Sequence, residues 1–301
     1  MRCDIEIFGH SCSDWSSGKY GAAAFRALTR AGIAWKRWGT AEPYREKFCE
    51  GASGVFTKQW KHKLSSAFGM ISVHAGEEEF FAMFVGTHGP KPAPSFFSLR
   101  CPPSLWSHGG DSLIELSHRL FHSLDCFHGQ VCHSDEYHAQ HYSERREGGG
   151  TRVVMLGIGY RECLPGIYWS NLFGPPVSQW IGEERLRTCP CHERRELAPG
   201  YHLLTAYPEI DGPDTPEALA AKDAIREHLG VDRFFDRRFP DRVTNAPPLD
   251  WSELYRATPK AHPQKLVELQ EKARKMGGWL EVSGDEMSLH LDGPTEPKDH
   301  A

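Results

Sequence analysis

The segment "LPGIYWSNLFGPPVSQWIGEERL", residues 164–186, has the most distinctive local pattern in the chain. Pro165-Gly166 is a turn dipeptide, and the alternating apolar and aromatic residues after it predict a strand over 166–173. Asn171 interrupts an apolar face of that strand, so it needs a hydrogen-bond partner or points into a groove. Gly174-Pro175-Pro176 ends the strand and begins a short helix whose core-facing residues are Val177, Trp180 and Ile181.

Strands and helices alternate irregularly on both sides of this segment. Three helices are predicted from their end signals: one from Asp111 to about Asp125, one opened by Thr215-Pro216-Glu217 and ended at Gly230, and one opened by Pro263. This irregular order predicts an α+β fold, with a mainly antiparallel sheet flanked by helices. The other predicted strands are Arg2–Phe8, Phe80–Val85, Ser95–Arg100, Arg152–Leu156 and Tyr201–Ala206.

The predicted organisation is a single compact domain over residues 1–291. The charged and glycine-rich stretch "SERREGGGT", 143–151, is a loop or an interdomain seam. We favour the loop, because neither half of the chain has a composition of its own. Residues 292–301 are expected to form an acidic, disordered tail.

Composition and charge narrow the class of protein. Of the 301 residues, 39% are hydrophobic and 25% are charged, as in ordinary folded proteins. No apolar run approaches the roughly 20 residues that span a bilayer. The N-terminal residues do not have the basic and apolar regions of an export signal, and nine cysteines are an odd number for a disulfide framework. We therefore expect a cytoplasmic protein with reduced thiols.

The net charge of −5 is carried by one end of the chain. Residues 281–301 contain six acidic side chains and one basic side chain, and the rest of the chain is balanced. This distribution argues against direct nucleic-acid binding, which needs a basic surface.

Residues 118–141 contain six histidines and two cysteines and raise the alternative of a metal-dependent hydrolase. On the predicted helix, however, His118 and His122 fall on the solvated face, beside Glu115 and Arg119. Arg119 stands where a zinc hydrolase has its glutamate base, and the later spacings match no zinc pattern. We therefore interpret these histidines as exposed or hydrogen-bonded.

Other short motifs are equally incomplete. Cys189–His192 ("CPCH") has too few ligands for a closed metal site and lacks the redox spacing. "GIGYRE" from Gly157 lacks the third glycine of a dinucleotide loop, and "GASGV" from Gly51 lacks the last glycine of a nucleophile elbow. We therefore assign no catalytic residue, no metal ligand and no cofactor.

The segment 164–186 resembles the immunity protein 52 family, the antidotes encoded beside toxins of type VI secretion and other polymorphic toxin systems. The resemblance implies a non-enzymatic protein that neutralises a co-encoded nuclease toxin with a restriction-endonuclease-like domain, by occluding its cleft or blocking its active assembly. The residues that carry the resemblance include Pro165, Gly166, Tyr168, Trp169, Asn171 and Gly174.

Two kinds of residue are candidates for contact with such a toxin. Acidic side chains would steer a basic cleft towards this protein. Tryptophans are frequent interface anchors, and three of them lie among basic residues where full burial is awkward. The candidates are Glu77, Glu78, Glu79, Asp285 and Glu286, together with Trp35, Trp38 and Trp60.

Overall fold

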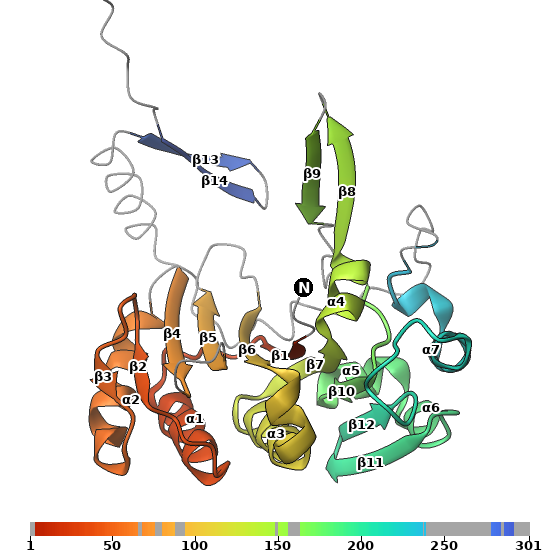
Figure 1. Ribbon diagram of the computed structural model, residues 1–301, viewed down its shortest axis with the longest axis horizontal. Helices are drawn as coiled ribbons and strands as arrows, with labels where there is room; N and C mark the ends of the chain where they lie inside the picture. Colours follow the sequence, from red (N-terminus) through yellow and green to blue (C-terminus); the bar gives the residue numbers. More distant parts are fainter. Residues whose placement is uncertain are drawn as a thin grey trace, which may run out of the picture.

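A ten-stranded antiparallel sheet forms the body of the protein (Figure 1), which confirms the predicted α+β class. The computed structural model describes residues 4–65, 68–75, 80–87, 94–147, 150–155, 163–236, 238, 278–283 and 286–291. The sheet order is β11-β12-β10-β7-β1-β6-β5-β4-β2-β3. Its strands are β1 (Ile5–Ser11), β2 (Arg37–Gly39), β3 (Glu46–Lys47), β4 (Phe68–His74), β5 (Phe81–Thr87), β6 (Ser95–Cys101), β7 (Cys126–His133), β10 (Ser170–Phe173), β11 (Glu193–Ala198) and β12 (Tyr201–Thr205).

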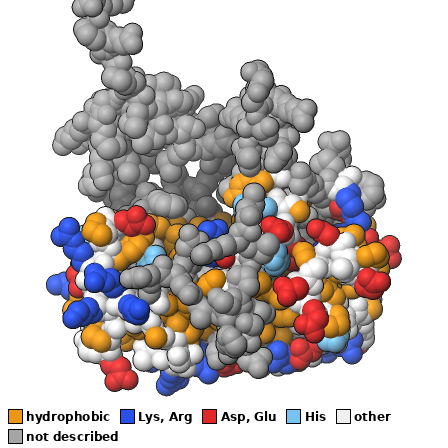
Figure 2. Space-filling model, viewed as in Figure 1, with side chains coloured by type: hydrophobic (Ala, Val, Ile, Leu, Met, Phe, Trp, Pro, Cys, Tyr) orange, Lys and Arg blue, Asp and Glu red, His pale blue; other side chains and the backbone are white. Residues whose placement is uncertain are grey.

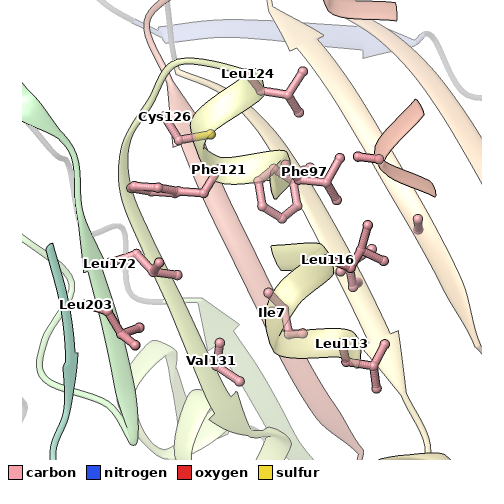
Figure 3. Packing of buried hydrophobic residues seen from close by; sticks show 14 of the residues in the cluster. Ile7, Phe97, Leu113, Leu116, Phe121, Leu124, Cys126, Val131, Leu172 and Leu203 are labelled. Carbon is pink, nitrogen blue, oxygen red and sulfur yellow. The ribbon is translucent and has the colours of Figure 1, made fainter. Parts of the chain in front are cut away.

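Helices cover both faces of the central strands. Neighbouring residues of a strand point to opposite faces, so Ile7 and Phe8 of β1 contact different layers. Ile7 lies in the core under the long helix α3 (Figure 3), whereas the ring of Phe8 stacks on Tyr137 of α4 with centroids 4.8 Å apart. The helices are α1 (Gly18–Arg30), α2 (Ser53–Lys63), α3 (Pro103–Ser123), α4 (Ser134–His141), α5 (Pro175–Ile181), α6 (Glu183–Arg187) and α7 (Pro216–Leu229), with short 3-10 turns at Glu50–Ala52 and Val231–Arg233.

Strand β7 is the centre of the histidine-rich segment. It pairs with β1 on one side and with β10 on the other, and all eight of its residues are buried. The histidines of this strand, His128 and His133, are therefore buried, and the exposed alternative of the sequence interpretation is wrong for them. A strand buried on both faces has no polar side to alternate with, so its sequence lacks the usual strand pattern.

The structure confirms the predicted ends of one helix and corrects the predicted start of another. Helix α7 is confirmed at both ends, since Thr215 caps it by accepting from the Ala218 N–H and Gly230 follows it with φ 111°. Helix α3 begins at Pro103, well before the predicted Asp111, with proline in its first turn. The predicted helix after Pro263 lies outside the described residues.

The segment 143–151 belongs to a hairpin of its own, β8 (Tyr142–Glu147) and β9 (Gly150–Met155). Strands from before and after this hairpin lie in the same ten-stranded sheet. A second hairpin consists of β13 (Gly278–Ser283) and β14 (Glu286–Leu291), and the tail 292–301 lies outside the described residues. Among the described helices, none combines the length and apolarity needed to cross a membrane.

Candidate functional site

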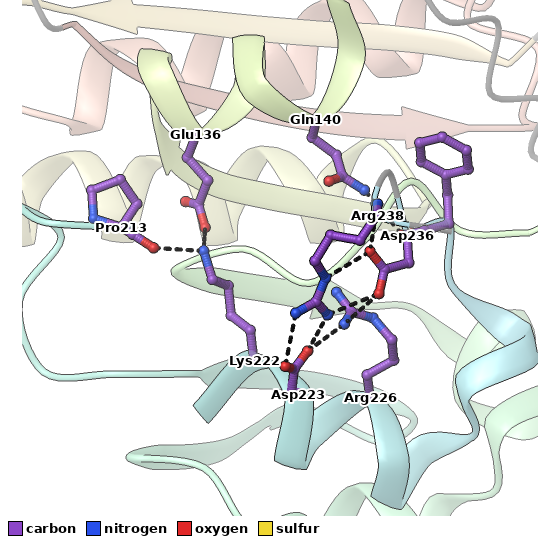
Figure 4. Close-up of polar contacts among 9 residues, drawn as sticks. Glu136, Gln140, Pro213, Lys222, Asp223, Arg226, Asp236 and Arg238 are labelled. Atoms are coloured by element: carbon purple, nitrogen blue, oxygen red, sulfur yellow. Dashed lines mark hydrogen bonds and ion pairs between the residues drawn. The ribbon is translucent and has the colours of Figure 1, made fainter. Parts of the chain in front are cut away.

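A polar cavity of about 350 Å³ lies between α4, α7 and the chain that leads into β10. Helix α4 contributes Glu136 and Gln140 to its wall, and Lys222 comes from α7. The segment 164–186 contributes Ile167 and Tyr168 to the wall. Figure 4 shows that Lys222 of α7 points towards Glu136 of α4, whereas Asp223 and Arg226 of α7 point towards Asp236 and Arg238.

A buried ion pair joins the two helices at the inner end of the cavity. The Lys222 Nζ lies 3.0 Å from Glu136 Oε1 and also donates to the Pro213 carbonyl at 2.8 Å. The second carboxylate oxygen of Glu136 accepts from the Trp169 backbone N–H at 3.3 Å. Burial raises the pKa of Glu136, and the ammonium of Lys222 opposes that rise. The pair therefore fixes α7 and the start of β10 to α4.

An arginine–aspartate cluster closes the outer end. Arg226 binds Asp223 at 2.6 Å and Asp236 at 3.1 Å, and Arg238 binds the same two carboxylates. Hydrogen bonds from Arg238 hold the pKa of Asp223 below its usual value. For Asp236, burial acts to raise the pKa, but hydrogen bonds from Arg238 and the charge of Arg226 lower it overall. The cluster ties residues 236–238 to α7.

Asn171 finds its partner within its own segment. Its Nδ2 donates to the Tyr168 carbonyl at 2.9 Å, and its Oδ1 accepts from the Tyr168 N–H at 3.1 Å. The side chain is fully buried, so the groove alternative does not apply. Gln140 holds the preceding turn by donating to the Pro165 carbonyl at 2.8 Å.

Glycine is required at two positions of this segment. Gly166 has φ 148°, and a Cβ there would come within 2.8 Å of Gln140 Nε2. A Cβ on Gly174 would come within 2.2 Å of the Cys126 carbonyl oxygen of β7. Residues 164–174 therefore form one wall of the cavity through Ile167 and Tyr168 and join the sheet at Gly174, and Tyr168 and Trp169 are themselves buried.

The histidines of α3 and α4 differ from the sequence interpretation. His118 is buried rather than solvated, whereas His122 is exposed as expected. Glu115 and Arg119, on the solvated face of the same helix, form an ion pair at 2.9 Å. On α4, His141 Nε2 lies 2.7 Å from the Tyr168 hydroxyl, and burial lowers the pKa of His141 to about 4. Within the described part of the chain, no three His, Cys, Asp or Glu side chains come together in a way that could hold a metal ion.

The burial of His118 predicts that acid destabilises the protein. Burial lowers its pKa from 6.5 to about 4. The unfolded chain therefore binds the proton more readily, and the stability is complete above pH 6.5 and is lost as pH falls towards 4. At pH 5 this one group is expected to reduce the free energy of unfolding by about 2 kcal/mol. Urea denaturation from pH 7.5 to 5 should show a shallower pH dependence for His118→Leu, whereas His122→Leu, exposed on the same helix, should keep the wild-type slope. Equal slopes in all three proteins would contradict this assignment.

The three candidate tryptophans lie in the core. Trp35, Trp38 and Trp60 are 6%, 1% and 0% exposed. Trp60 donates its indole N–H to the Trp15 carbonyl at 2.6 Å and packs on Phe84 with ring centroids 5.1 Å apart. The basic residues nearby point to solvent while the rings face inward, so the expectation that burial would be awkward here is wrong. These side chains are not available as surface anchors.

Only one of the five acidic candidates lies among the described residues. Glu77, Glu78, Glu79 and Asp285 lie outside the described residues, and Glu286 begins β14. A different acidic group is exposed at the N-terminal end of α7, next to the cavity. It was missed in the sequence because its members are two or three residues apart and form no charge run; they are Glu209, Asp211, Asp214 and Glu217.

In the Cys189-Pro190-Cys191 turn, the two thiols are hydrogen-bonded to each other. Cys189 is buried, and Cys191 donates its S–H to the Glu193 carbonyl at 3.2 Å. A hydrogen bond from Cys189 lowers the pKa of Cys191, and the same bond raises the pKa of Cys189.

These features define an α+β protein with a charged cavity between two helices that pack at one end of a long antiparallel sheet. No protein-family model matches the chain, and no curated protein matches it. Among solved structures, it is similar to the Pseudomonas aeruginosa T6SS protein PA0821. The TM-score is 0.50 at 12% sequence identity, and the match covers 87% of this chain and 92% of that one. At this identity the likeness concerns the fold.

Proposed function

We propose that this protein acts in type VI secretion as an immunity protein that binds a co-encoded toxin. The observation that carries the proposal is the fold shared with a T6SS protein over 87% of this chain. The resemblance of residues 164–186 to the immunity protein 52 family supports it independently, and this segment contributes Ile167 and Tyr168 to the wall of the charged cavity.

The sequence resemblance makes the proposal more specific. It points to the antidote TsiT, which pairs with the nuclease effector TseT, and so to a toxin with a restriction-endonuclease-like domain. In this proposal the protein performs no chemistry, contacts no nucleic acid itself, and acts in the cytoplasm by covering the cleft of the toxin or by blocking its active assembly.

The described surface offers one region suited to a basic nuclease cleft. Exposed carboxylates at Glu209, Asp211, Asp214 and Glu217 lie along the entry to α7, and no basic residue occurs in 208–220. Acidic side chains are prominent on the side of the molecule that contains α7 (Figure 2). Leu219, 39% exposed, lines the neighbouring cavity and would add an apolar contact. Opposite charges across an interface speed association and select the partner.

The first test is protection from the toxin. The product of the neighbouring gene should be toxic when expressed alone and harmless when this chain is expressed with it, and the two proteins should purify together. Unreduced killing in cells that contain abundant folded protein would overturn the proposal. Turnover of a substrate by the purified chain, lost on changing a single histidine or cysteine, would instead support a hydrolase.

A charge-reversal series tests the acidic surface. The triple variant Glu209→Lys, Asp211→Lys and Glu217→Lys is expected to slow association with the toxin at least tenfold at low salt and to flatten its salt dependence. Stopped-flow or surface-based kinetics gives both quantities. The matched control reverses Glu42, Glu46 and Glu50, three exposed acids near the opposite edge of the sheet. The same reversal at Glu77–Glu79 tests the acidic run found in the sequence. Unchanged association rates for the first variant would exclude this surface.

A further inference from the structure

A second cavity lies at the other end of the sheet, and the function proposed above does not use it. It has a volume of about 290 Å³ and lies between the edge strands β2 and β3, the loop that joins them, and helix α2. Trp38 and Gly39 come from β2, Arg45 and Glu46 from the approach to β3 and its start, and Gln59 from α2.

Trp38 contributes a buried hydrogen-bond donor that has no acceptor among the described residues. Its side chain is 1% exposed, and its indole N–H has no hydrogen-bond partner in the part of the chain that the structure describes. Three other buried indoles are satisfied: Trp15, Trp35 and Trp60 each donate to a backbone carbonyl at 3.0, 3.1 and 2.6 Å. A buried donor without a partner is unfavourable. The nitrogen is covered, so an acceptor from outside reaches it only when the cavity wall shifts, and the gain of the missing hydrogen bond favours that shift.

The surface around this cavity is basic, and its cations form no ion pair with a carboxylate of the described residues. In the described residues of 36–63, no lysine or arginine lies within ion-pair distance of a carboxylate. Around α6 and α7, in contrast, Arg187, Arg226 and Arg238 all form ion pairs. Figure 2 shows Lys and Arg side chains gathered at the left, over α2, β2 and β3. The exposed cations of this surface are Lys36, Arg37, Arg45, Lys47, Lys58 and Lys61, against the exposed acids Glu42, Glu46 and Glu50.

An exposed hydrophobic side chain lies beside the cavity. Val55 is 52% exposed, the largest exposed fraction among the large hydrophobic side chains that the structure describes. It precedes Gln59 by four residues in α2, so the two side chains share one face of the helix. A ligand that fills the cavity would therefore meet a hydrophobic side chain at its rim.

We propose that this end of the sheet binds an acidic peptide segment of a protein partner, with one carboxylate inside the cavity. The carboxylate pairs with Arg45, and the lysines of α2 attract the neighbouring acidic residues. A shift of the cavity wall that uncovers the Trp38 indole N–H adds this donor to the site. The volume suits one side chain with its backbone. Glu42 and Glu46 at the rim disfavour a continuous phosphate backbone, so the surface fits a peptide better than a nucleic acid.

The test uses two fluorescein-labelled twelve-residue Gly-Ser peptides, one containing four glutamates and the other four glutamines at the same positions. Fluorescence anisotropy with the full chain, at physiological ionic strength, should show the glutamate peptide binding at least tenfold more tightly. Arg45→Gln with Lys61→Gln should weaken that binding at least tenfold. The matched control, Arg187→Gln with Arg195→Gln, removes the same charge from the opposite end and should leave it within twofold.

Trp38→Phe tests the contribution of the cavity to peptide binding separately from that of the surrounding charged residues. It keeps a single aromatic ring to pack on Phe56, whose ring centroid lies 4.9 Å from that of Trp38, and removes the N–H donor together with the second ring of the indole. Binding of the glutamate peptide should weaken about fivefold, while thermal unfolding confirms that the variant is folded. Wild-type affinity in this variant would exclude the carboxylate from the cavity and overturn the proposal.

Three further outcomes would also overturn it. These are equal binding of the two peptides, equal weakening by the control pair, and tighter binding of a labelled twelve-nucleotide single-stranded RNA than of the glutamate peptide. Sedimentation without peptide tests whether a second copy of the chain binds this surface. Self-association that is abolished by Arg45→Gln with Lys61→Gln would assign the surface to that second copy and overturn the proposal. These measurements are made without the toxin, so their outcomes do not depend on whether the proposed immunity function is correct.

Discussion

Replacing Lys222 with methionine is expected to lower the free energy of unfolding by about 3–5 kcal/mol, because it leaves the Glu136 carboxylate buried without its cation. Methionine is close to lysine in length and flexibility, so the change tests the charge more than the packing. The Pro213 carbonyl also loses its donor. Urea denaturation at pH 7.5, followed by tryptophan fluorescence, measures the loss.

The loss caused by Lys222→Met should grow with pH. Burial already raises the folded-state pKa of Glu136 above 4.5, and removing Lys222 raises it further. The folded state then binds the proton more tightly than the unfolded state, so stability falls as pH rises from the unfolded pKa to the folded one. The variant should therefore lie closer to wild type at pH 5 than at pH 8.

A double variant provides the control for this pair. Adding Glu136→Gln to Lys222→Met removes the buried charge and keeps an oxygen that accepts the Trp169 N–H. It should recover about 2 kcal/mol at pH 8 and remove the added pH dependence. If the double variant were no more stable than Lys222→Met at pH 8, the uncompensated carboxylate would not be the cause.

Gly174→Ala is expected to destabilise the protein by about 3 kcal/mol or more, the second large effect. The new Cβ would meet the backbone of β7, with the Cys126 carbonyl at 2.2 Å and the Phe127 Cα at 3.0 Å. Backbone atoms of a central strand cannot move aside as a side chain can. The Gly174 N–H also donates to the Phe127 carbonyl at 2.8 Å, so a shift would strain that hydrogen bond.

Gly54→Ala is the matched control for this substitution. Gly54 lies in α2, and a Cβ there would meet nothing within 4 Å. The same chemical change should therefore leave stability unchanged or raise it by up to about 1 kcal/mol, because alanine favours a helix. Chemical denaturation of both variants compares them. A similar effect at the two positions would show that the contact with β7 is not responsible.

The parts of the fold that followed from the sequence are those with local signals. Thr215-Pro216 and Gly230 mark both ends of α7, and the structure places them there. Helix α3 was found only in its second half, because Gly109-Gly110 resembles an interruption although the helix continues through it. Strand β7 was missed altogether, since its burial on both faces comes from neighbours that are distant in sequence.

Only one segment of the candidate site was predicted from the sequence. Residues 164–174 stood out in the sequence, but their partners Glu136 and Lys222 carried no signal, because each looks like an ordinary charged residue of a helix. The tryptophans were misjudged for a related reason. Basic neighbours in sequence say little about burial when alternate residues of a strand face opposite sides, as Arg37 and Trp38 do.

The position of β1 has a consequence for how the protein is made. Its two neighbours in the sheet are β6 and β7, and the partner of Ile5 on β7 is His133. Ser11 pairs with Ser95 of β6 and with Cys126 of β7. During synthesis from the N-terminus, both edges of this strand therefore stay unpaired for more than eighty further residues, and one edge for more than a hundred. Such late, long-range pairing slows folding and exposes a strand that can aggregate. The nascent chain should therefore depend on chaperones until β7 closes the centre of the sheet.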